Sequence, residues 1–442
     1  MARLKLSDSI AWILLFVLAG LVIHTPVTVW LVSLGAPVGV KAWKEVLVAA
    51  AGVLLLVDLI RRKKTDLLRH DPLLWLVAGY GALHLLSLFV CSESVYSVIA
   101  GLMIDVRYVA YFAVIYVFLK LYPAYRQSFV RVGIVGAGIV VGCALLQLIA
   151  PHDALKYIGY SDATIKPYIL LDENPHYVRM NSTLRGPNPL GAYAMIVLLG
   201  VFAYGMSVGR TLRDSRKKWL HVFLAVGGLA ALWISYSRSA WLGLLAGIGV
   251  LVVLRHRQLL FGVRQLAAVV LLCALVALIG YAVRDTAMFK NLVLHDNPTT
   301  GAQYTSDEGH RDSLKVGIDR LLQQPFGAGI GSTGSASLGS DSPLIIENQY
   351  LMVAHEVGWL GLLVFVWLWG AVLWRLLQQE RSWLRDAVLA SGLGLMLIAC
   401  TWPVLVDDPV SMIWWGMAAV ALTLVVKKKG QNHGTTPHKK TA

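Results

Sequence analysis

Charged residues are scarce in this chain of 442 residues, and Asp, Glu, Lys and Arg together make up only 14% of it. Ordinary soluble proteins have about a quarter of their residues charged, so the composition argues against a soluble globular domain. Hydrophobic residues account for 57% of the chain, and the mean hydropathy is +0.65. They form blocks of roughly 18–25 residues, the length at which a helix crosses a hydrocarbon core of about 30 Å. The sequence therefore predicts an all-α, polytopic membrane protein.

Cysteine is also rare, and the sequence has neither an internal repeat nor a low-complexity segment apart from a short basic tail. The four cysteines lie within or at the edges of apolar runs, without the spacing of metal ligands: Cys91, Cys143, Cys273 and Cys400. They indicate neither a disulfide framework nor a zinc site. The absence of duplicated halves also bears on function, because many transporters are built from repeats.

The few charged residues are unevenly distributed, and the net charge is +14. The basic residues form short clusters between apolar blocks, at 61–64, 210–218, 255–258 and 427–429. This is the positive-inside pattern that orients membrane proteins, not a surface for nucleic acid. We therefore expect no nucleic-acid partner and two cytoplasmic termini. The first apolar segment is too long for a signal peptide, so we interpret it as a membrane span.

About twelve transmembrane helices fit this pattern, with every basic cluster on the cytoplasmic side. Their expected ranges are 9–33, 43–60, 72–91, 94–120, 128–150, 189–209, 219–235, 239–254, 262–282, 345–374, 386–406 and 409–426. Loops longer than about 12–15 residues are usually functional or disordered, and two outer loops exceed this length. The expected divisions are an N-terminal bundle of about five helices (1–150), an extracytoplasmic loop (151–188), central transmembrane helices (189–282), a large extracytoplasmic loop (283–343), C-terminal transmembrane helices (344–426) and a cytoplasmic tail (427–442).

The second outer loop contains a predicted short helix, "SDEGHRDSLKVGIDRLLQQ", at 306–324. Ser306 or Asp307 can cap it, and an apolar stripe follows at helical spacing: Leu314, Ile318, Leu321 and Leu322. A solvated surface helix is one interpretation of its charged residues. The segment "GAGIGSTG" at 327–334 lacks the lysine and the strand–helix context of a phosphate-binding P-loop. We interpret it as a tight connection back to the membrane.

Arginines stand beside two outer turns. Arg179 and Arg185 flank a polar turn before "GPNP" at 186–189, which starts a helix whose N-terminus faces outward. Such an N-terminus with nearby arginines attracts phosphate groups, although contact with lipid head groups would explain the same residues.

Arg238 lies between two apolar spans, beside Ser235, Ser237 and Ser239. A charge at bilayer depth costs roughly 2.5–3.5 kcal/mol on insertion scales, so such a residue normally faces a cavity or a partner. Snorkelling to the head groups is the alternative. The flanking serines favour a polar, water-accessible turn.

Together these motifs resemble the O-antigen ligase and O-antigen polymerase family, integral membrane glycosyltransferases that act on undecaprenyl-linked glycans. Four segments carry the resemblance, at 179–193, 235–245, 310–332 and 347–361. The resemblance implies a GT-C-like fold in the cytoplasmic (inner) membrane, with the active site on the extracytoplasmic face. The implied partners are an undecaprenyl-pyrophosphate-linked glycan donor, a glycan or lipid acceptor, and membrane lipids. No metal or other cofactor is implied.

The ligases of this family have a His, then Asn, Ser or Gln, then nine residues, then Gly-x-x-Gly. Asn348, Gly358 and Gly361 fit this spacing, but Glu347 stands where the ligases have histidine. This departure leaves ligase and polymerase both open. We expect the two glycines to allow close helix packing, and His355 and Glu356 to lie about two turns deeper, paired within the bundle.

The resemblance also implies roles for the remaining candidates. The developing charge on a pyrophosphate leaving group would be stabilised by arginines, here Arg185 or Arg179 together with Arg238 and Arg311. Asn188 would support them. The acceptor hydroxyl needs a base, for which Glu347 and His310 are the two candidates.

A transporter or flippase of lipid-linked glycans is the alternative that about twelve spans would also permit. Transporters concentrate polar residues near the bilayer midplane, whereas here the polar residues cluster toward one face. A purely structural role would leave Arg238 unexplained.

Overall fold

The computed structural model describes residues 5–90, 93–171, 174–208, 215–255, 286, 306–339 and 343–423. The expected span at 262–282 and the tail at 427–442 lie outside these residues, as does most of 283–305. The described α-helices are α1 (Leu6–Leu21), α2 (His24–Ser33), α3 (Trp43–Arg61), α4 (Asp66–Arg69), α5 (Pro72–Leu86), α6 (Val95–Leu121), α7 (Arg126–Ile149), α8 (Pro187–Val208), α9 (Ser215–Ser235), α10 (Arg238–Arg255), α13 (Ser306–Gln323), α14 (Gln349–Gln378), α15 (Trp383–Ile398) and α16 (Asp408–Leu422). Short 3-10 helices are η1 (Val38–Ala42), η2 (Ser87–Phe89), η3 (Pro123–Tyr125), η4 (Ala154–Ile158), η7 (Gly334–Gly339) and η8 (Val404–Val406).

The all-α polytopic class is confirmed, and the described residues contain one small sheet. In it β1 (Ile169–Leu171) pairs antiparallel with β2 (Asn174–Arg179), and Ile169 stands opposite Arg179. Among the described helices, 7 are long and apolar enough to cross a membrane, or up to 8 if α1 and α2 form one bent span. Two shorter helices overlap the expected ranges at 386–406 and 409–426, but α15 ends at Ile398 and α16 at Leu422.

The expected first span at 9–33 is bent, because α1 and α2 meet at an angle of 79°. The break falls at Val22 and Ile23, just before His24. Pro26 follows in the first turn of α2. Proline has no backbone N–H, and its ring clashes with the carbonyl of the residue four positions earlier, here Val22. A helix cannot continue unbent through this position.

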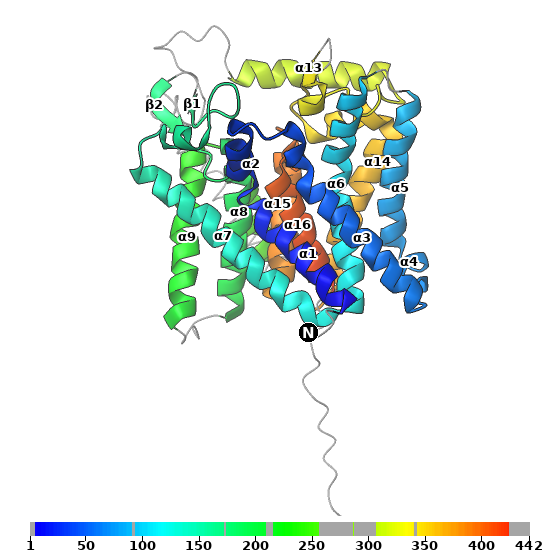
Figure 1. Ribbon diagram of the computed structural model, residues 1–442. Helices are drawn as coiled ribbons and strands as arrows, with labels where there is room; N and C mark the ends of the chain where they lie inside the picture. Colours follow the sequence, from blue (N-terminus) through cyan, green and yellow to red (C-terminus); the bar gives the residue numbers. More distant parts are fainter. Residues whose placement is uncertain are drawn as a thin grey trace, which may run out of the picture.

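The basic ends of the helices gather on one side of the bundle, here called the basic face. At this face Asp71 precedes α5 and joins three helices, since Lys120 of α6 lies 2.5 Å from its Oδ2 and Arg375 of α14 lies 2.6 Å from its Oδ1. The opposite side, here called the loop face, carries β1, β2 and α13. Figure 1 shows α13 lying across this end of the upright helices.

The core lies where α6, α14 and α16 meet, and large aromatic side chains fill it. Trp369 of α14 packs against Trp414 and Trp415 of α16, with ring centroids 5.7 and 6.3 Å apart. Trp415 also contacts Phe112 of α6 at 5.4 Å. All four side chains are fully buried. Their packing holds together the helices whose ends form the loop face.

The short helix expected at 306–324 is confirmed as α13. It runs alongside the beginning of α14, because Ser313 lies beside Glu347, Gly317 beside Leu351, and Leu321 beside Trp359. Three residues of the apolar stripe are partly exposed, Leu314 and Ile318 at 42% each and Leu322 at 65%.

Gly358 has a different role from the helix packing expected of it. The helix α14 is kinked at Gly358, which has φ 73° and ψ −174°. A Cβ atom there would lie 2.5 Å from the carbonyl oxygen of Pro325, so the glycine makes room for the backbone of the connection after α13. That connection is the tight return segment expected at 327–334, and Gly327, Gly329 and Gly331 within it all have positive φ. Gly361 lies one turn beyond the kink, against Val357 of its own helix.

His355 and Glu356 precede this kink and are buried, at 2% and 1% exposure. The backbone N–H of Gly331 donates to Oε1 of Glu356 at 3.1 Å, and Asp105 of α6 faces the same carboxyl group. The expectation that Glu356 pairs within the bundle is confirmed.

Candidate functional site

A cavity of about 530 Å³ opens at the loop face and collects most of the candidate residues. Six segments that are far apart in the sequence contribute to it: the end of β2, the start of α8, the turn before α10, α13, the segment before α14, and the connection from α15 to α16. Its lining residues are Arg179, Asn188, Tyr236, Ser237, Arg238, Ser239, Leu242, His310, Arg311, Leu314, Glu347, Cys400, Thr401 and Trp402. Three arginines, one histidine and one glutamate therefore share one cavity.

Arg179 is held in the cavity wall by two hydrogen bonds. Its Nε donates to the carbonyl of Ser235 at 2.9 Å, and its Nη2 donates to Oδ1 of Asn188 at 2.5 Å. Asn188 lies in the first turn of α8, so the "GPNP" turn supplies the partner that orients the guanidinium. Asn188, which we expected to support the arginines, therefore contacts Arg179 directly.

Arg238 is the first residue of α10 and enters the cavity from a tight turn. The turn is made by Tyr236, which has φ 48°, and by Ser237, whose N–H donates to Oγ of Ser235 at 3.2 Å. The N-terminus of α10 therefore lies at the cavity together with the guanidinium. Both favour a bound anion, because the first backbone N–H groups of a helix have no partner within it.

His310 and Glu347, the two candidate bases, are in direct contact. The Nδ1 atom of His310 lies 2.6 Å from Oε2 of Glu347, and both side chains are a little over one third exposed. The backbone N–H of Glu347 also donates to Oγ of Ser313 at 2.6 Å, which fixes α13 to the segment that carries Glu347.

Asn348 caps α14 directly beside this pair. Its Oδ1 accepts hydrogen bonds from the N–H groups of Tyr350 and Leu351, both at 3.0 Å, as an N-cap residue does. Its Nδ2 donates to the carbonyl of Cys400 at 2.8 Å. Asn348 therefore fastens the α15–α16 connection to the start of α14, and both segments line the cavity.

Arg185 is the one candidate arginine that does not line the cavity. Its side chain is exposed, and it interacts electrostatically with Asp407, the N-cap residue of α16. Burial and the neighbouring Asp408 raise the pKa of Asp407 to about 6, and Arg185 opposes this increase. The structure therefore separates Arg179 from Arg185, which the sequence motif could not do.

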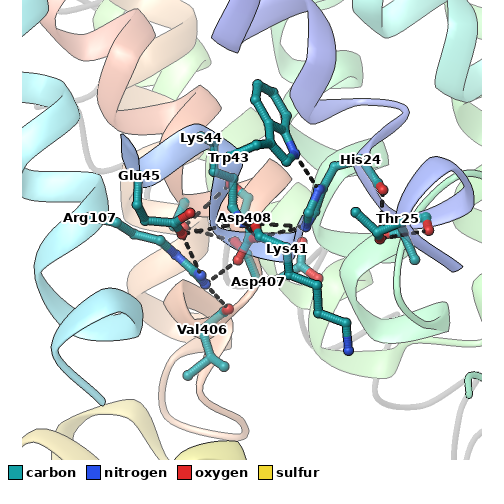
Figure 2. A network of polar contacts seen from close by, with 12 residues as sticks. His24, Thr25, Lys41, Trp43, Lys44, Glu45, Arg107, Val406, Asp407 and Asp408 are labelled. Atoms are coloured by element: carbon teal, nitrogen blue, oxygen red, sulfur yellow. Dashed lines mark hydrogen bonds and ion pairs between the residues drawn. The ribbon is translucent and has the colours of Figure 1, made fainter. Parts of the chain in front are cut away.

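Asp408 and Arg107 belong to a network of polar contacts on the outer part of the bundle (Figure 2). Lys44 lies 2.8 Å from Asp408, and Arg107 contacts both Asp408 and Glu45. Arg107 also donates to the carbonyl of Val406 at 2.5 Å. Two carboxylates and a carbonyl thus engage Arg107, which we interpret as a residue that holds the α15–α16 connection in place.

The α15–α16 connection is the part of the cavity that sequence reasoning missed. Thr401 and Trp402 line the cavity, yet they follow an apolar segment without any polar pattern around them. A signal existed only in "TWP", where proline ends the helix before it. Among the described residues no group of three or more His, Cys, Asp or Glu side chains could hold a metal ion.

In a comparison with protein families, a family model described as O-antigen ligase matches residues 222–366. This range is about one third of the chain and includes Arg238, His310, Arg311 and Glu347. Arg179 and Arg185 lie outside it. No curated protein matches the chain in sequence.

Proposed function

The family match assigns the chain to the O-antigen ligase/polymerase family of membrane proteins, and from this premise we propose that it is a membrane glycosyltransferase. It transfers a glycan from an undecaprenyl-pyrophosphate donor to an acceptor hydroxyl at the outer face of the cytoplasmic membrane. The loop face is then extracytoplasmic, and the basic face with both termini is cytoplasmic, in line with the positive-inside rule. The reaction requires no metal, because arginines supply the positive charge.

The observation that carries the proposal is the convergence of Arg179, Arg238 and Arg311 on one cavity with the His310–Glu347 pair. When the bond between the anomeric carbon and the pyrophosphate oxygen breaks, negative charge develops on the leaving group. Arginines bind phosphate oxygens in a bidentate manner, and preorganised positive charge stabilises the transition state most. The N-terminus of α10 adds to this at Arg238.

The other half of the reaction is the attack of the acceptor oxygen on the anomeric carbon. In our proposal the carboxylate of Glu347, whose Oε2 lies 2.6 Å from Nδ1 of His310, holds the imidazole in place through this contact. This contact fixes the tautomer of the ring and leaves Nε2 to take the proton from the acceptor hydroxyl. Here α13 would provide the imidazole that the ligases have at the position of Glu347. Glu347 acting directly as the base is the alternative.

Transfer can be measured with purified protein in proteoliposomes supplied with lipid-linked oligosaccharide. A ladder of products without added acceptor identifies a polymerase, and a single addition to an acceptor identifies a ligase. We expect Arg238→Ala to reduce transfer by about 10²–10³-fold, as the loss of one preorganised donor does. Arg255→Ala, at the other end of α10, is the matched control and should leave transfer unchanged. Normal transfer by Arg238→Ala would refute the role given to this cavity.

A further inference from the structure

A second cavity, of about 480 Å³, lies between α7, α8, α9, α15 and α16, away from the candidate active site. It reaches from the ends of these helices at the basic face to the middle of the bundle, where Tyr193 of α8 and Ile413 of α16 line it. The helices α7, α9 and α15 begin at that face and contribute Gln127, Lys217 and Trp383 from their first turns. The cavity therefore begins in the leaflet beside the basic face, away from the first cavity at the loop face.

The rim of this cavity combines aromatic rings with a positive charge. Tyr204 contacts Trp383 with ring centroids 5.6 Å apart, and it contacts His221 at 6.0 Å. Lys217 lines the cavity beside them, within the basic sequence "RKK" at 216–218. Aromatic belts and flanking basic residues mark the level of the lipid head groups.

The walls below the rim are apolar. They are made by side chains such as Val130, Val197 and Leu224, and two polar groups among them are hydrogen-bonded within the protein. Nε1–H of Trp414 donates to the carbonyl of Val388 at 3.1 Å, and the hydroxyl of Ser391 donates to the carbonyl of Ala387 at 2.8 Å. A ligand inside would meet mainly hydrocarbon surface.

A glycine in the wall keeps this space open. A Cβ atom on Gly200 of α8 would meet no other atom within 4 Å. The volume falls in the range of roughly 300–1,000 Å³ that is typical of ligand pockets. An apolar chamber with an aromatic and basic rim at head-group level suits a lipid chain whose head group is negative.

We propose that this cavity is a binding site for an anionic phospholipid of the leaflet beside the basic face. One acyl chain occupies the chamber between α7, α8 and α16, and the phosphate lies at Lys217. Basic pockets between transmembrane helices on the basic side of a membrane protein attract anionic head groups in this way. The proposal does not depend on the reaction at the loop face.

The test is photo-crosslinking of the full-length protein in vesicles that contain phosphatidylglycerol with a diazirine in its acyl chain. We expect labelling of peptides around Val197, Gly200 and Trp414, and much weaker labelling by the matching phosphatidylcholine probe. Gly200→Leu fills the chamber and should reduce the labelling at least fivefold. Gly249→Leu is the control, because Gly249 of α10 also has nothing within 4 Å but does not line the cavity.

Lys217→Glu tests the rim separately, and it remains informative if Gly200→Leu fails to fold. It should lower labelling by the phosphatidylglycerol probe at least fivefold while labelling by the phosphatidylcholine probe is unchanged. Equal labelling of the native protein by both probes would overturn the proposal, as would full labelling of a folded Gly200→Leu protein. Labelling of the cavity by a diazirine polyprenyl phosphate but not by phosphatidylglycerol would also overturn it, because the occupant would then be a polyprenyl chain.

Discussion

At the scale of single residues, the contact between His310 and Glu347 gives the two candidate bases different expected roles. The Nδ1 atom of His310 lies 2.6 Å from the carboxylate, so in our proposal Nε2 is the atom that takes a proton from an acceptor. We expect His310→Ala to lower the transfer rate by about 10²–10⁴-fold, the usual contribution of a general base. Glu347→Gln keeps the shape of the side chain and should cost less, about 10-fold to 10²-fold, because only the orientation of the ring suffers.

Initial rates of transfer from lipid-linked oligosaccharide would distinguish these roles. His176→Ala serves as a control, because His176 of β2 is exposed and does not line the cavity. If Glu347→Gln abolished transfer and His310→Ala had little effect, the glutamate itself would be the base.

The two arginines of the motif at 179–193 should also differ. Arg179 lines the cavity and is oriented by Ser235 and Asn188, whereas Arg185 faces Asp407 outside it. We expect Arg179→Ala to reduce transfer by about 10²–10³-fold, in line with the loss of one charge-stabilising group. Arg185→Ala should reduce it less than about tenfold under the same conditions. A larger loss with Arg185→Ala than with Arg179→Ala would mean that the pyrophosphate binds elsewhere on the loop face.

At the scale of elements, the kink in α14 connects the membrane helix to the segment that carries His310. A residue with a side chain at position 358 would have to adopt a positive φ, and its Cβ atom would clash with the carbonyl oxygen of Pro325. We expect Gly358→Ala to destabilise the protein by at least about 1–3 kcal/mol, the cost of a strained backbone conformation. Gly370→Ala is the matched control in the same helix, because a Cβ at Gly370 would meet nothing within 4 Å. Thermal unfolding in detergent measures both, and equal melting temperatures would contradict the role of the kink.

Hydropathy predicted the helices well, because burial in lipid depends on length and apolar content, which the sequence displays directly. It did not predict the bend before α2 or the kink at Gly358. Pro26 lies within an apolar run, and a Gly-x-x-Gly pattern is equally typical of helix packing. These bends depend on contacts with distant segments, such as Pro325 against Gly358.

The candidate site was predicted only in part, because it also depends on contacts between distant segments. Motifs and the family resemblance identified Arg179, Arg238, His310 and Glu347 as candidates. The choice between Arg179 and Arg185 depends on which way a short loop turns, which spacing alone does not determine. Thr401 and Trp402 reach the cavity through contacts between residues far apart in the chain, such as that of Asn348 with the carbonyl of Cys400.

At the scale of the whole molecule, Asp71 joins the first part of the chain to the last. Its carboxylate accepts hydrogen bonds from Tyr116 at 2.9 Å and from Lys120 at 2.5 Å, and Arg375 of α14 lies 2.6 Å away. It also caps α5 by accepting from the N–H of Leu73 at 3.1 Å. Burial acts to raise the pKa of Asp71, but these contacts outweigh burial and lower the pKa from 3.8 to about 2.

A carboxylate whose pKa is lower in the folded state contributes stability above its unfolded pKa and loses it as the pH falls through the folded value. For Asp71 this contribution is present above about pH 4 and disappears between about pH 4 and pH 2. Since one pKa unit corresponds to about 1.4 kcal/mol, it amounts to about 2 kcal/mol at neutral pH.

We therefore expect Asp71→Asn to lower the free energy of unfolding by about 2 kcal/mol at pH 7 and by much less at pH 2. Detergent-induced unfolding, followed by circular dichroism at several pH values, measures this difference. Asp66→Asn is the control, because Asp66 of α4 is exposed and forms none of the ion pairs that join the helices. A difference between native protein and Asp71→Asn that stayed constant from pH 7 to pH 2 would show that the charge of Asp71 does not hold α5, α6 and α14 together.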